Sequence, residues 1–266
     1  MMKHILSVQD LSCVGRCSLT VALPVISAMG IRCSVLPTAV LSTHTAFPKP
    51  EVVSLTDSLP GFARHWQDNG ITFDGISLGY LSDPDQAAAV AAIVDGFPCP
   101  VILDPVMGDH GKLYSRITSA HIEAMRSLCG KAEVVLPNVT EAAALSGMDY
   151  RAQGDESYYA ALGRGILALG AKHVVITGVE RGDEIGWFYV NQSEVYSRFS
   201  PRIPRQFHGT GDLFAAVFAG SYLTNANVIR SAQKAADFVA ACVAGTEVST
   251  PHGVEFELQL PLLREH

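Results

Sequence analysis

Short apolar runs rich in β-branched residues alternate with longer, alanine-rich stretches of helical periodicity along most of the chain. The runs are typical of strands, and apolar residues spaced three or four apart are typical of helices. The predicted strands cover residues 5–9, 31–36, 75–79, 101–104, 133–136 and 173–177. The predicted helices between them cover residues 18–29, 85–94, 119–128, 140–146 and 157–169.

The order of these elements indicates the fold class. Strand, helix and strand in repeated succession predict parallel strands joined by crossover helices, which is an α/β fold. Residues 185–190 and 194–199 predict an antiparallel hairpin on that sheet, and residues 210–223 and 228–244 predict two closing helices. No long linker, low-complexity tract or internal repeat interrupts the sequence, so we expect one domain over residues 1–266.

Composition and charge exclude several classes of protein. The 266 residues are 48% hydrophobic and 17% charged, which excludes a disordered chain. With a net charge of −7 we expect no nucleic acid partner, although amides and a metal ion can still bind an anionic substrate. The sequence shows no signal-peptide core and no apolar run near the ~18 residues of a membrane span. The six cysteines form no CxxC pair, so we expect reduced, mostly buried thiols and a soluble cytoplasmic protein without membrane contact.

Polar and aromatic side chains follow several predicted strands. Parallel α/β sheets bind ligands beyond the carboxyl ends of their strands, so these side chains are candidates for a site. A carboxylate that ends an apolar strand, such as Asp104, is costly to bury without a metal or a hydrogen-bonding partner. Asp104 could instead cap the following turn. The residues at strand ends are Gln9, Asp10, Tyr80, Asp104, Asn138 and Thr177.

The segment Gly209-Thr210-Gly211-Asp212 stands directly before an apolar helix. Glycine allows close backbone approach, and a helix N-terminus offers unpaired N–H groups to an anion. An acid in the same turn would repel a bound anion, but it would suit a general base that deprotonates an alcohol attacking phosphorus. The segment therefore predicts either a phosphoryl-transfer site with Asp212 as base, or a glycine-rich loop in which Asp212 only caps the helix.

Three motifs together resemble the ribokinase-like superfamily of small-molecule kinases, and most closely its pyridoxal kinase branch. They are 209–212, Asp-Pro-Val-Met-Gly at 104–108 and Asn-Val-Thr-Glu at 138–141. Leu6-Ser7-Val8-Gln9, Ser42-Thr43-His44-Thr45 and Gly79-Tyr80-Leu81 support that branch. The resemblance covers about residues 3–250 and implies a three-layer α/β/α fold with a mainly parallel central sheet and a small antiparallel hairpin.

The resemblance implies transfer of the γ-phosphoryl group of ATP to the hydroxymethyl group of pyridoxal, pyridoxine or pyridoxamine. Asp212 is then the base, and the backbone of Gly209, Thr210 and Gly211 forms the anion hole. It also implies a magnesium ion, a potassium-type activating ion and a homodimer. The implied magnesium residues are Asp104, Asn138 and Glu141; the implied nucleotide contacts are Thr177, Arg205, Gln206, Phe207 and His208; and the implied acceptor pocket contains Thr45 and Tyr80. Tyr80 could instead belong to the core.

One position departs from the family pattern, because Asp10 stands where many pyridoxal kinases have serine. We hypothesise that Asp10 contacts the acceptor and favours a protonated ring or an amine. The alternative is that Asp10 faces solvent or caps the following turn. For the whole chain, a hydroxymethylpyrimidine kinase is the second candidate, a sugar or nucleoside kinase the third, and a non-catalytic ligand-binding relative the fourth.

Overall fold

The computed structural model describes residues 2–45, 47–205, 207–247 and 252–264, which fall into two units. The first unit comprises Met1–Gly79 with Ile203–His266, and the second comprises Tyr80–Arg202. Each unit has its own strands and helices. The single domain expected from the sequence stays a prediction.

In the first unit, four strands lie in the order β4 (Gly75–Leu78), β1 (His4–Ser12), β2 (Arg32–Leu41) and β3 (Val52–Ser54). Strand β1 pairs in parallel with β2 and β4, while β3 is antiparallel to β2. Strand β1 is buried from Ile5 to Asp10. A strand covered on both faces reads as a nearly continuous apolar run, which is why the sequence revealed it.

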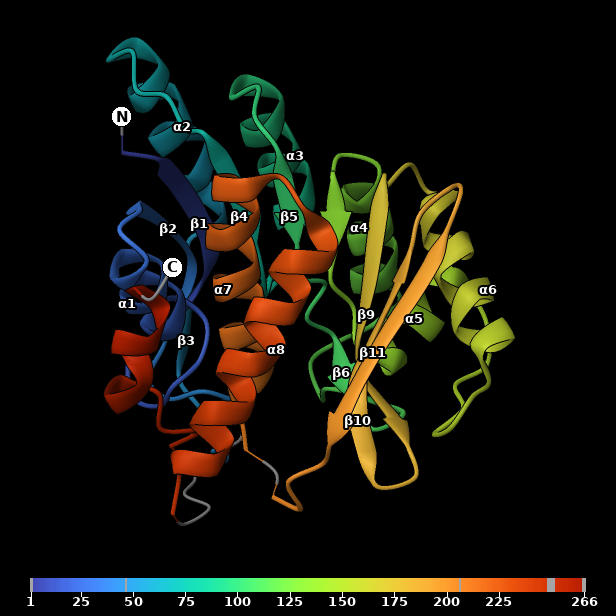
Figure 1. The fold of residues 1–266 in the computed structure, drawn as a ribbon. Coiled ribbons are helices and arrows are strands. Elements are labelled where there is room, and N and C mark those ends of the chain that lie inside the picture. The colour runs from blue at the N-terminus through green and yellow to red at the C-terminus, as the bar shows by residue number, and fades with distance from the viewer. Residues whose placement is uncertain (1, 46, 206, 248–251, 265–266) are drawn as a thin grey trace. The chain divides into compact units, whose positions relative to one another are not determined.

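Five helices accompany these strands: α1 (Leu19–Ala28), α2 (Leu59–Asp68) with the 3-10 turn η1 (Thr56–Ser58), α7 (Thr210–Asn225), α8 (Val228–Gly245) and the 3-10 helix η2 (Glu257–Arg264). Helix α1 packs on β1, β2 and α7, and α7 packs on α8 (Figure 1). Helix α7 is buried without a break from Leu213 to Tyr222. A helix that is apolar all round belongs in a core, so the N-terminus of α7 is held firmly.

In the second unit, five strands lie in the order β5 (Val101–Leu103), β8 (Val134–Val135), β9 (His173–Arg181), β10 (Glu184–Val190) and β11 (Val195–Pro201). Strands β5, β8 and β9 are parallel, and β10 and β11 continue as an antiparallel hairpin (Figure 1). A second hairpin joins β6 (Gly108–Asp109) to β7 (Lys112–Leu113). The helices are α3 (Gln86–Gly96), α4 (Ser119–Cys129), α5 (Val139–Ser146) and α6 (Glu156–Leu167).

The predicted α/β class is confirmed, with a mostly parallel sheet, an antiparallel pair and flanking helices. The sequence prediction missed β3, α2, the β6–β7 hairpin and η2, and it ended β2 five residues early. Strand β3, the β6–β7 hairpin and η2 are short elements or edge elements. Helix α2 is amphipathic and, averaged over its residues, neither apolar nor polar. The expectation of mostly buried thiols is wrong: Cys129 and Cys242 are buried, Cys13 is exposed, and the other three free cysteines are half-buried.

Candidate active site

Asp212 lies in the first turn of α7, directly after the glycine-containing turn. The N-cap of α7 is Gly209, whose φ of 85° and ψ of 0° place it in the left-handed region that favours glycine. The interpretation of Asp212 as the helix cap is therefore wrong. The first-turn N–H groups of Thr210 and Gly211 belong to the positive end of the helix dipole, which suits an anion.

The Asp10 carboxyl of β1 and the backbone N–H of Ser18, just before α1, both act on the Asp212 carboxyl. Burial and the nearby Asp10 charge raise the pKa of Asp212 to about 7, because both disfavour a second negative charge. A base with a pKa near neutral pH can take a proton and release it again, so Asp212 is suited to proton transfer.

Asp10 lies near the end of β1 and is only 3% exposed. The Ser12 hydroxyl donates to Asp10 Oδ2 over 2.9 Å. Burial raises the pKa of Asp10, and the hydroxyls of Ser12 and Ser18 oppose that increase. The alternative in which Asp10 faces solvent is therefore wrong. Burial and the charges of Asp212 and Asp10 raise the pKa of the Cys17 thiol, which disfavours its thiolate form.

Gly209 packs tightly against the loop before α1. A Cβ atom on residue 209 would lie 2.1 Å from the carbonyl oxygen of Arg16, so only glycine fits. The segment 252–257 hydrogen-bonds to both sides of this contact: Arg16 N–H donates to the His252 carbonyl over 2.7 Å, and Val254 N–H donates to the His208 carbonyl over 3.0 Å. This segment therefore supports the turn at Gly209 on both sides.

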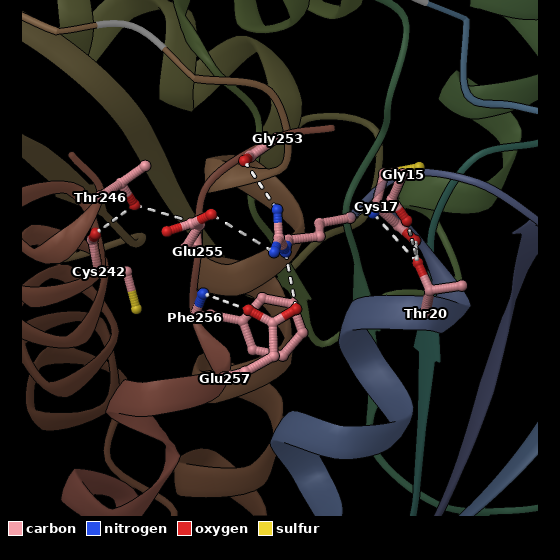
Figure 2. A network of polar contacts seen from close by, with 10 residues as sticks. Gly15, Cys17, Thr20, Cys242, Thr246, Gly253, Glu255, Phe256 and Glu257 are labelled. Atoms are coloured by element: carbon pink, nitrogen blue, oxygen red, sulfur yellow. Dashed lines mark hydrogen bonds and ion pairs between the residues drawn. The ribbon is translucent and has the colours of Figure 1, made fainter. Parts of the chain in front are cut away.

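The Arg16 side chain holds this segment through Glu255 and Glu257, which are labelled in Figure 2. Its Nε donates to Glu257 Oε1 over 2.7 Å, and its Nη2 lies 3.7 Å from Glu255 Oε1. The Thr246 hydroxyl accepts from the Glu255 N–H over 2.9 Å and donates to the Cys242 carbonyl over 2.8 Å, which ties the segment to the end of α8. A hollow of about 290 Å³ is lined by Gly15, Arg16, His252 and Glu255.

The other predicted site residues of the first unit differ in their contacts and in their exposure. Arg205 Nη1 donates to the Thr246 carbonyl over 2.6 Å, so its guanidinium anchors the chain before α7. The His208 ring lies 5.5 Å from the His44 ring, centroid to centroid. Thr45 and His208 are exposed, Phe207 is half-buried, and Gln206 lies outside the described residues.

In the second unit, Asn138 and Glu141 begin α5 with a reciprocal capping box. Glu141 N–H donates to Asn138 Oδ1 over 3.0 Å, and Asn138 N–H donates to Glu141 Oε2 over 2.9 Å. Glu141 Oε1 accepts from the Met107 N–H over 2.9 Å, and Asn138 Nδ2 donates to the Gly108 carbonyl over 2.7 Å. The two side chains thus share one turn, as their spacing predicted, and they fix the segment after β5.

Glu141 is 3% exposed, and its burial raises its pKa above the usual value. The charge of Asp109 adds to this increase, so Asp109 lies near enough to act on Glu141. Asp104 directly follows β5 and is half-buried. The next helix, α4, has Thr118 as its N-cap, so Asp104 does not cap a helix. Asp104 and Glu141 follow the carboxyl ends of the neighbouring parallel strands β5 and β8, and we call this part of the unit the acidic edge.

Thr177 lies beside Asn138, because the two form a parallel β-bridge and Thr177 N–H donates to the Pro137 carbonyl over 2.8 Å. Tyr80 follows β4 in the sequence and is 7% exposed. Such burial is compatible with an aromatic pocket wall and with a core position, so its role stays a prediction.

The acidic edge fits magnesium by the chemistry of its donors. Mg²⁺ prefers oxygen ligands and usually takes only one or two carboxylates, with water and phosphate oxygens completing its shell. The resemblance assigns Asp104 and Glu141 to that pair, and this assignment stays a prediction. Among the described residues no group of three His, Cys, Asp or Glu side chains is placed to hold a metal without such help. Likewise, no helix among them is long and apolar enough to cross a membrane.

Sequence reasoning missed Ser12, Ser18, Arg16, Asp109 and the segment 252–257. For Ser18, the sequence indicated only that a helix begins there. Asp109 directly follows the motif at residues 104–108, on which the resemblance rests in part. The contacts of Arg16 with residues more than 200 positions away leave no local pattern. These residues act through tertiary packing, which a single sequence does not display.

A family model described as phosphomethylpyrimidine kinase matches residues 63–255. A pyridoxine/pyridoxal/pyridoxamine kinase from Bordetella avium is 29% identical over 260 residues, which cover 92% of this chain and 86% of that protein.

Two solved structures are similar over nearly the full length. A pyridoxal kinase from Lactobacillus plantarum is 33% identical with a TM-score of 0.92, and the match covers 99% of this chain and 97% of that one. A protein from Bacteroides thetaiotaomicron, provisionally described as a phosphomethylpyrimidine kinase and solved in a crystal form with pyridoxal, is 32% identical with a TM-score of 0.93. That match covers 99% of this chain and 96% of the other. The resemblance stated from the motifs is confirmed.

Proposed function

Because the chain belongs to the phosphomethylpyrimidine kinase family, we propose that it is an ATP-dependent kinase that phosphorylates the hydroxymethyl group of pyridoxal, pyridoxine or pyridoxamine. The observation that carries this proposal is Asp212, a carboxyl with a pKa of about 7 in the turn that also presents the amides of an anion hole. The similarity of the whole chain to pyridoxal kinases supports the choice of acceptor.

In the proposed reaction the acceptor hydroxyl gives its proton to Asp212 as its oxygen bonds to the γ-phosphorus of ATP. The bond between the γ-phosphorus and the bridging oxygen breaks, and ADP leaves with that oxygen. The amides of Gly209, Thr210 and Gly211 stabilise the charge of the transferred group, since fixed dipoles need no reorganisation during the reaction.

The residues of the acidic edge have a separate task. Asp104 and Glu141 would hold magnesium and its waters, and the ion would neutralise phosphate charge. Asn138 acts through its contacts, because its amide fixes both Glu141 and the Gly108 carbonyl. Thr177, Arg205, Phe207 and His208 would contact the nucleotide, and Thr45 and Tyr80 would contact the acceptor. A potassium-type ion, a homodimer and a cytoplasmic location belong to the same proposal.

The decisive experiment measures ADP release with a panel of acceptors: the three pyridine alcohols, hydroxymethylpyrimidine and ribose. We expect turnover with the pyridine alcohols and its loss in the Asp212→Asn variant, with kcat lower by roughly 10²–10⁴-fold, as for other positioned general bases. Circular dichroism serves as the folding control. Near-normal turnover by a folded Asp212→Asn protein would remove Asp212 from the mechanism.

Each other outcome has its own meaning. A preference for hydroxymethylpyrimidine would favour the acceptor that the family description suggests. Turnover of ribose would indicate a sugar kinase, and no turnover with any acceptor would indicate a ligand-binding relative. Size-exclusion chromatography with light scattering tests the dimer, which should have twice the 28.4 kDa of one chain.

A further inference from the structure

Two glycines with positive φ approach the backbone of Arg16 from different segments. Gly209 stands before α7 and Gly253 lies in the segment 252–257, with φ of 85° and 95°. A Cβ on residue 209 would lie 2.1 Å from the Arg16 carbonyl oxygen, and a Cβ on residue 253 would lie 3.1 Å from the same oxygen. Three segments that are distant in the sequence therefore meet at one peptide group, with little room for a side chain at either glycine.

The segment 252–257 also orients the first amide of the turn before α7. Val254 N–H donates to the His208 carbonyl over 3.0 Å. This carbonyl and the Gly209 N–H belong to the same peptide group, which is planar and trans, so the two point in opposite directions. The hydrogen bond from Val254 therefore holds the Gly209 N–H facing away from the segment.

The Arg16 side chain contacts the same segment at three places (Figure 2). Its Nε donates to Glu257 Oε1 over 2.7 Å, and its Nη1 donates to the Gly253 carbonyl over 3.5 Å. Its Nη2 lies 3.7 Å from Glu255 Oε1. A guanidinium presents its donors in a rigid planar fork, so it can hold three acceptors in fixed positions, which an ammonium group on a flexible stem cannot do.

Stability alone does not explain these contacts. The side chains of Glu255 and Glu257 are 46% and 51% exposed. Ion pairs with such exposed partners contribute little to the free energy of unfolding. The segment also has its own anchors, because Val254 and Phe256 are buried. What Arg16 adds is therefore the position of the segment rather than stability.

We propose that Arg16 is a positioning residue of the anion hole: its guanidinium holds the segment 252–257 against the turn at Gly209. Through the hydrogen bond from Val254 to His208, this segment keeps the Gly209 N–H aimed at the transferred phosphoryl group. An anion hole lowers the barrier because its donors are oriented before the reaction begins. The inference rests on the proposed function, in which the amides of this turn bind the transferred group.

Arg16→Met removes the fork and keeps an apolar stem of similar length. We expect kcat to fall by ~10-fold, less than the ~10²–10³-fold of a donor removed outright, because the amides remain but lose their orientation. KM for pyridoxal should be unchanged, since the loss concerns the transition state and not the binding of the acceptor. Tm should fall by no more than ~2–4 °C, because exposed ion pairs contribute little.

Two further variants distinguish positioning from direct contact with phosphate. Arg16→Lys keeps the charge without the fork, so kcat should stay low. Glu257→Gln removes the partner of Nε and should lower kcat, and combining it with Arg16→Met should lower kcat no further than Arg16→Met alone, because both break one contact. Glu257→Gln also tests this contact if Arg16→Met folds poorly. Rescue by lysine, or normal kcat in Glu257→Gln, would mean that Arg16 contacts phosphate itself and would overturn the proposal.

Lys3→Met is the matched control. It removes another exposed ion pair of the same unit, in which Lys3 Nζ lies 3.4 Å from Asp74 Oδ1. Lys3 stands before the amino end of β1, whereas Arg16 follows its carboxyl end. The control should change Tm about as much as Arg16→Met does, without changing kcat. A purely structural role for Arg16 predicts normal kcat for both folded variants, and that result would contradict the proposal.

Amide hydrogen exchange tests the inference without kinase activity. Exchange of the Val254 N–H, followed by NMR in the ligand-free protein, reports its hydrogen bond to His208 directly. We expect this exchange to be faster by ~10-fold or more in Arg16→Met, because the segment opens locally more often, and to be unchanged in Lys3→Met. Unchanged exchange in Arg16→Met would overturn the inference, whereas a wild type that phosphorylates none of the pyridine alcohols would overturn only the proposed function.

Discussion

Asp10 places a carboxyl at the end of a buried strand, where burying a serine would cost far less free energy. Its hydrogen bond from Ser12 and its 3% exposure show that the chain supports this acid with its own donors. A buried carboxylate near an acceptor site attracts a cationic group more strongly than a neutral one, because water screens the interaction less. The acid that departs from the family pattern is therefore the best candidate for acceptor choice.

We expect Asp10→Ser to lower kcat/KM for pyridoxamine, which carries an amine, by ~10-fold relative to pyridoxine. The reason is the loss of one charge-assisted contact. Initial rates with each acceptor at fixed ATP measure this ratio. The control is Ser12→Ala, which removes a donor to Asp10 but keeps the acid and should keep the order of preference. Unchanged relative kcat/KM values in Asp10→Ser would show that Asp10 does not select the acceptor.

The two glycines at the start of α7, Gly209 and Gly211, are explained by different physical requirements. Residue 209 must be glycine for the chain to pack, because a Cβ there would collide with the Arg16 carbonyl oxygen and because the φ of this residue is positive. Gly211 has an ordinary helical backbone, and a Cβ there would meet no other atom within 4 Å. Packing explains the first glycine, and only a close approach by a ligand would explain the second.

This contrast predicts opposite effects on stability. Gly209→Ala should lower Tm by ~5 °C or more because the Arg16 carbonyl must move. Gly211→Ala should keep or raise Tm by ~2–4 °C, because alanine favours a helix by about 1 kcal/mol. Both should lower kcat if the amides of this turn bind the transferred group. Differential scanning fluorimetry and steady-state kinetics test the pair, and normal kcat in Gly211→Ala would exclude close approach at that position.

Regular elements were predictable from the sequence because their signals are local. The parallel strands of both units and the helices α1 and α3 to α8 follow from apolar runs and periodicity within single segments. The capping box of Asn138 and Glu141 is equally local, since its members are three residues apart. The short edge strand β3 and the β6–β7 hairpin bury too little to leave such a pattern.

The candidate site was predictable only in part. The residues of the glycine-containing turn and of the acidic edge stand in continuous motifs, so the sequence could name them. The pKa of Asp212 depends on Asp10 and Ser18, which are about 200 positions away in the sequence. The contact between Gly209 and Arg16 likewise arises only when distant segments pack. A single sequence names the chemical groups, and folding sets their properties.

At the scale of the whole molecule, a buried base with a raised pKa lowers the free energy of unfolding as pH rises. An acid whose pKa is higher in the folded protein binds more protons there than in the unfolded chain. The stability that it contributes is therefore complete below the unfolded pKa of ~3.9, and it is lost as pH rises through the folded pKa. For Asp212 that loss extends to a pH of about 7. The raised pKa of Asp10 acts in the same direction.

Replacing Asp212 by asparagine should remove this cost. We expect the Tm of Asp212→Asn to exceed that of the ligand-free wild type by a margin that widens between pH 5 and pH 8, by ~5 °C, since two pH units of linkage correspond to ~2–3 kcal/mol. Scanning calorimetry at several pH values measures the margin. Asp57→Asn, at an exposed aspartate of the same unit, controls for the change in net charge and should show a constant margin. If Asp212→Asn also gave a constant margin, the Asp212 carboxyl would titrate alike in the folded and unfolded chain, and its tuning as a base by burial and by Asp10 would be wrong.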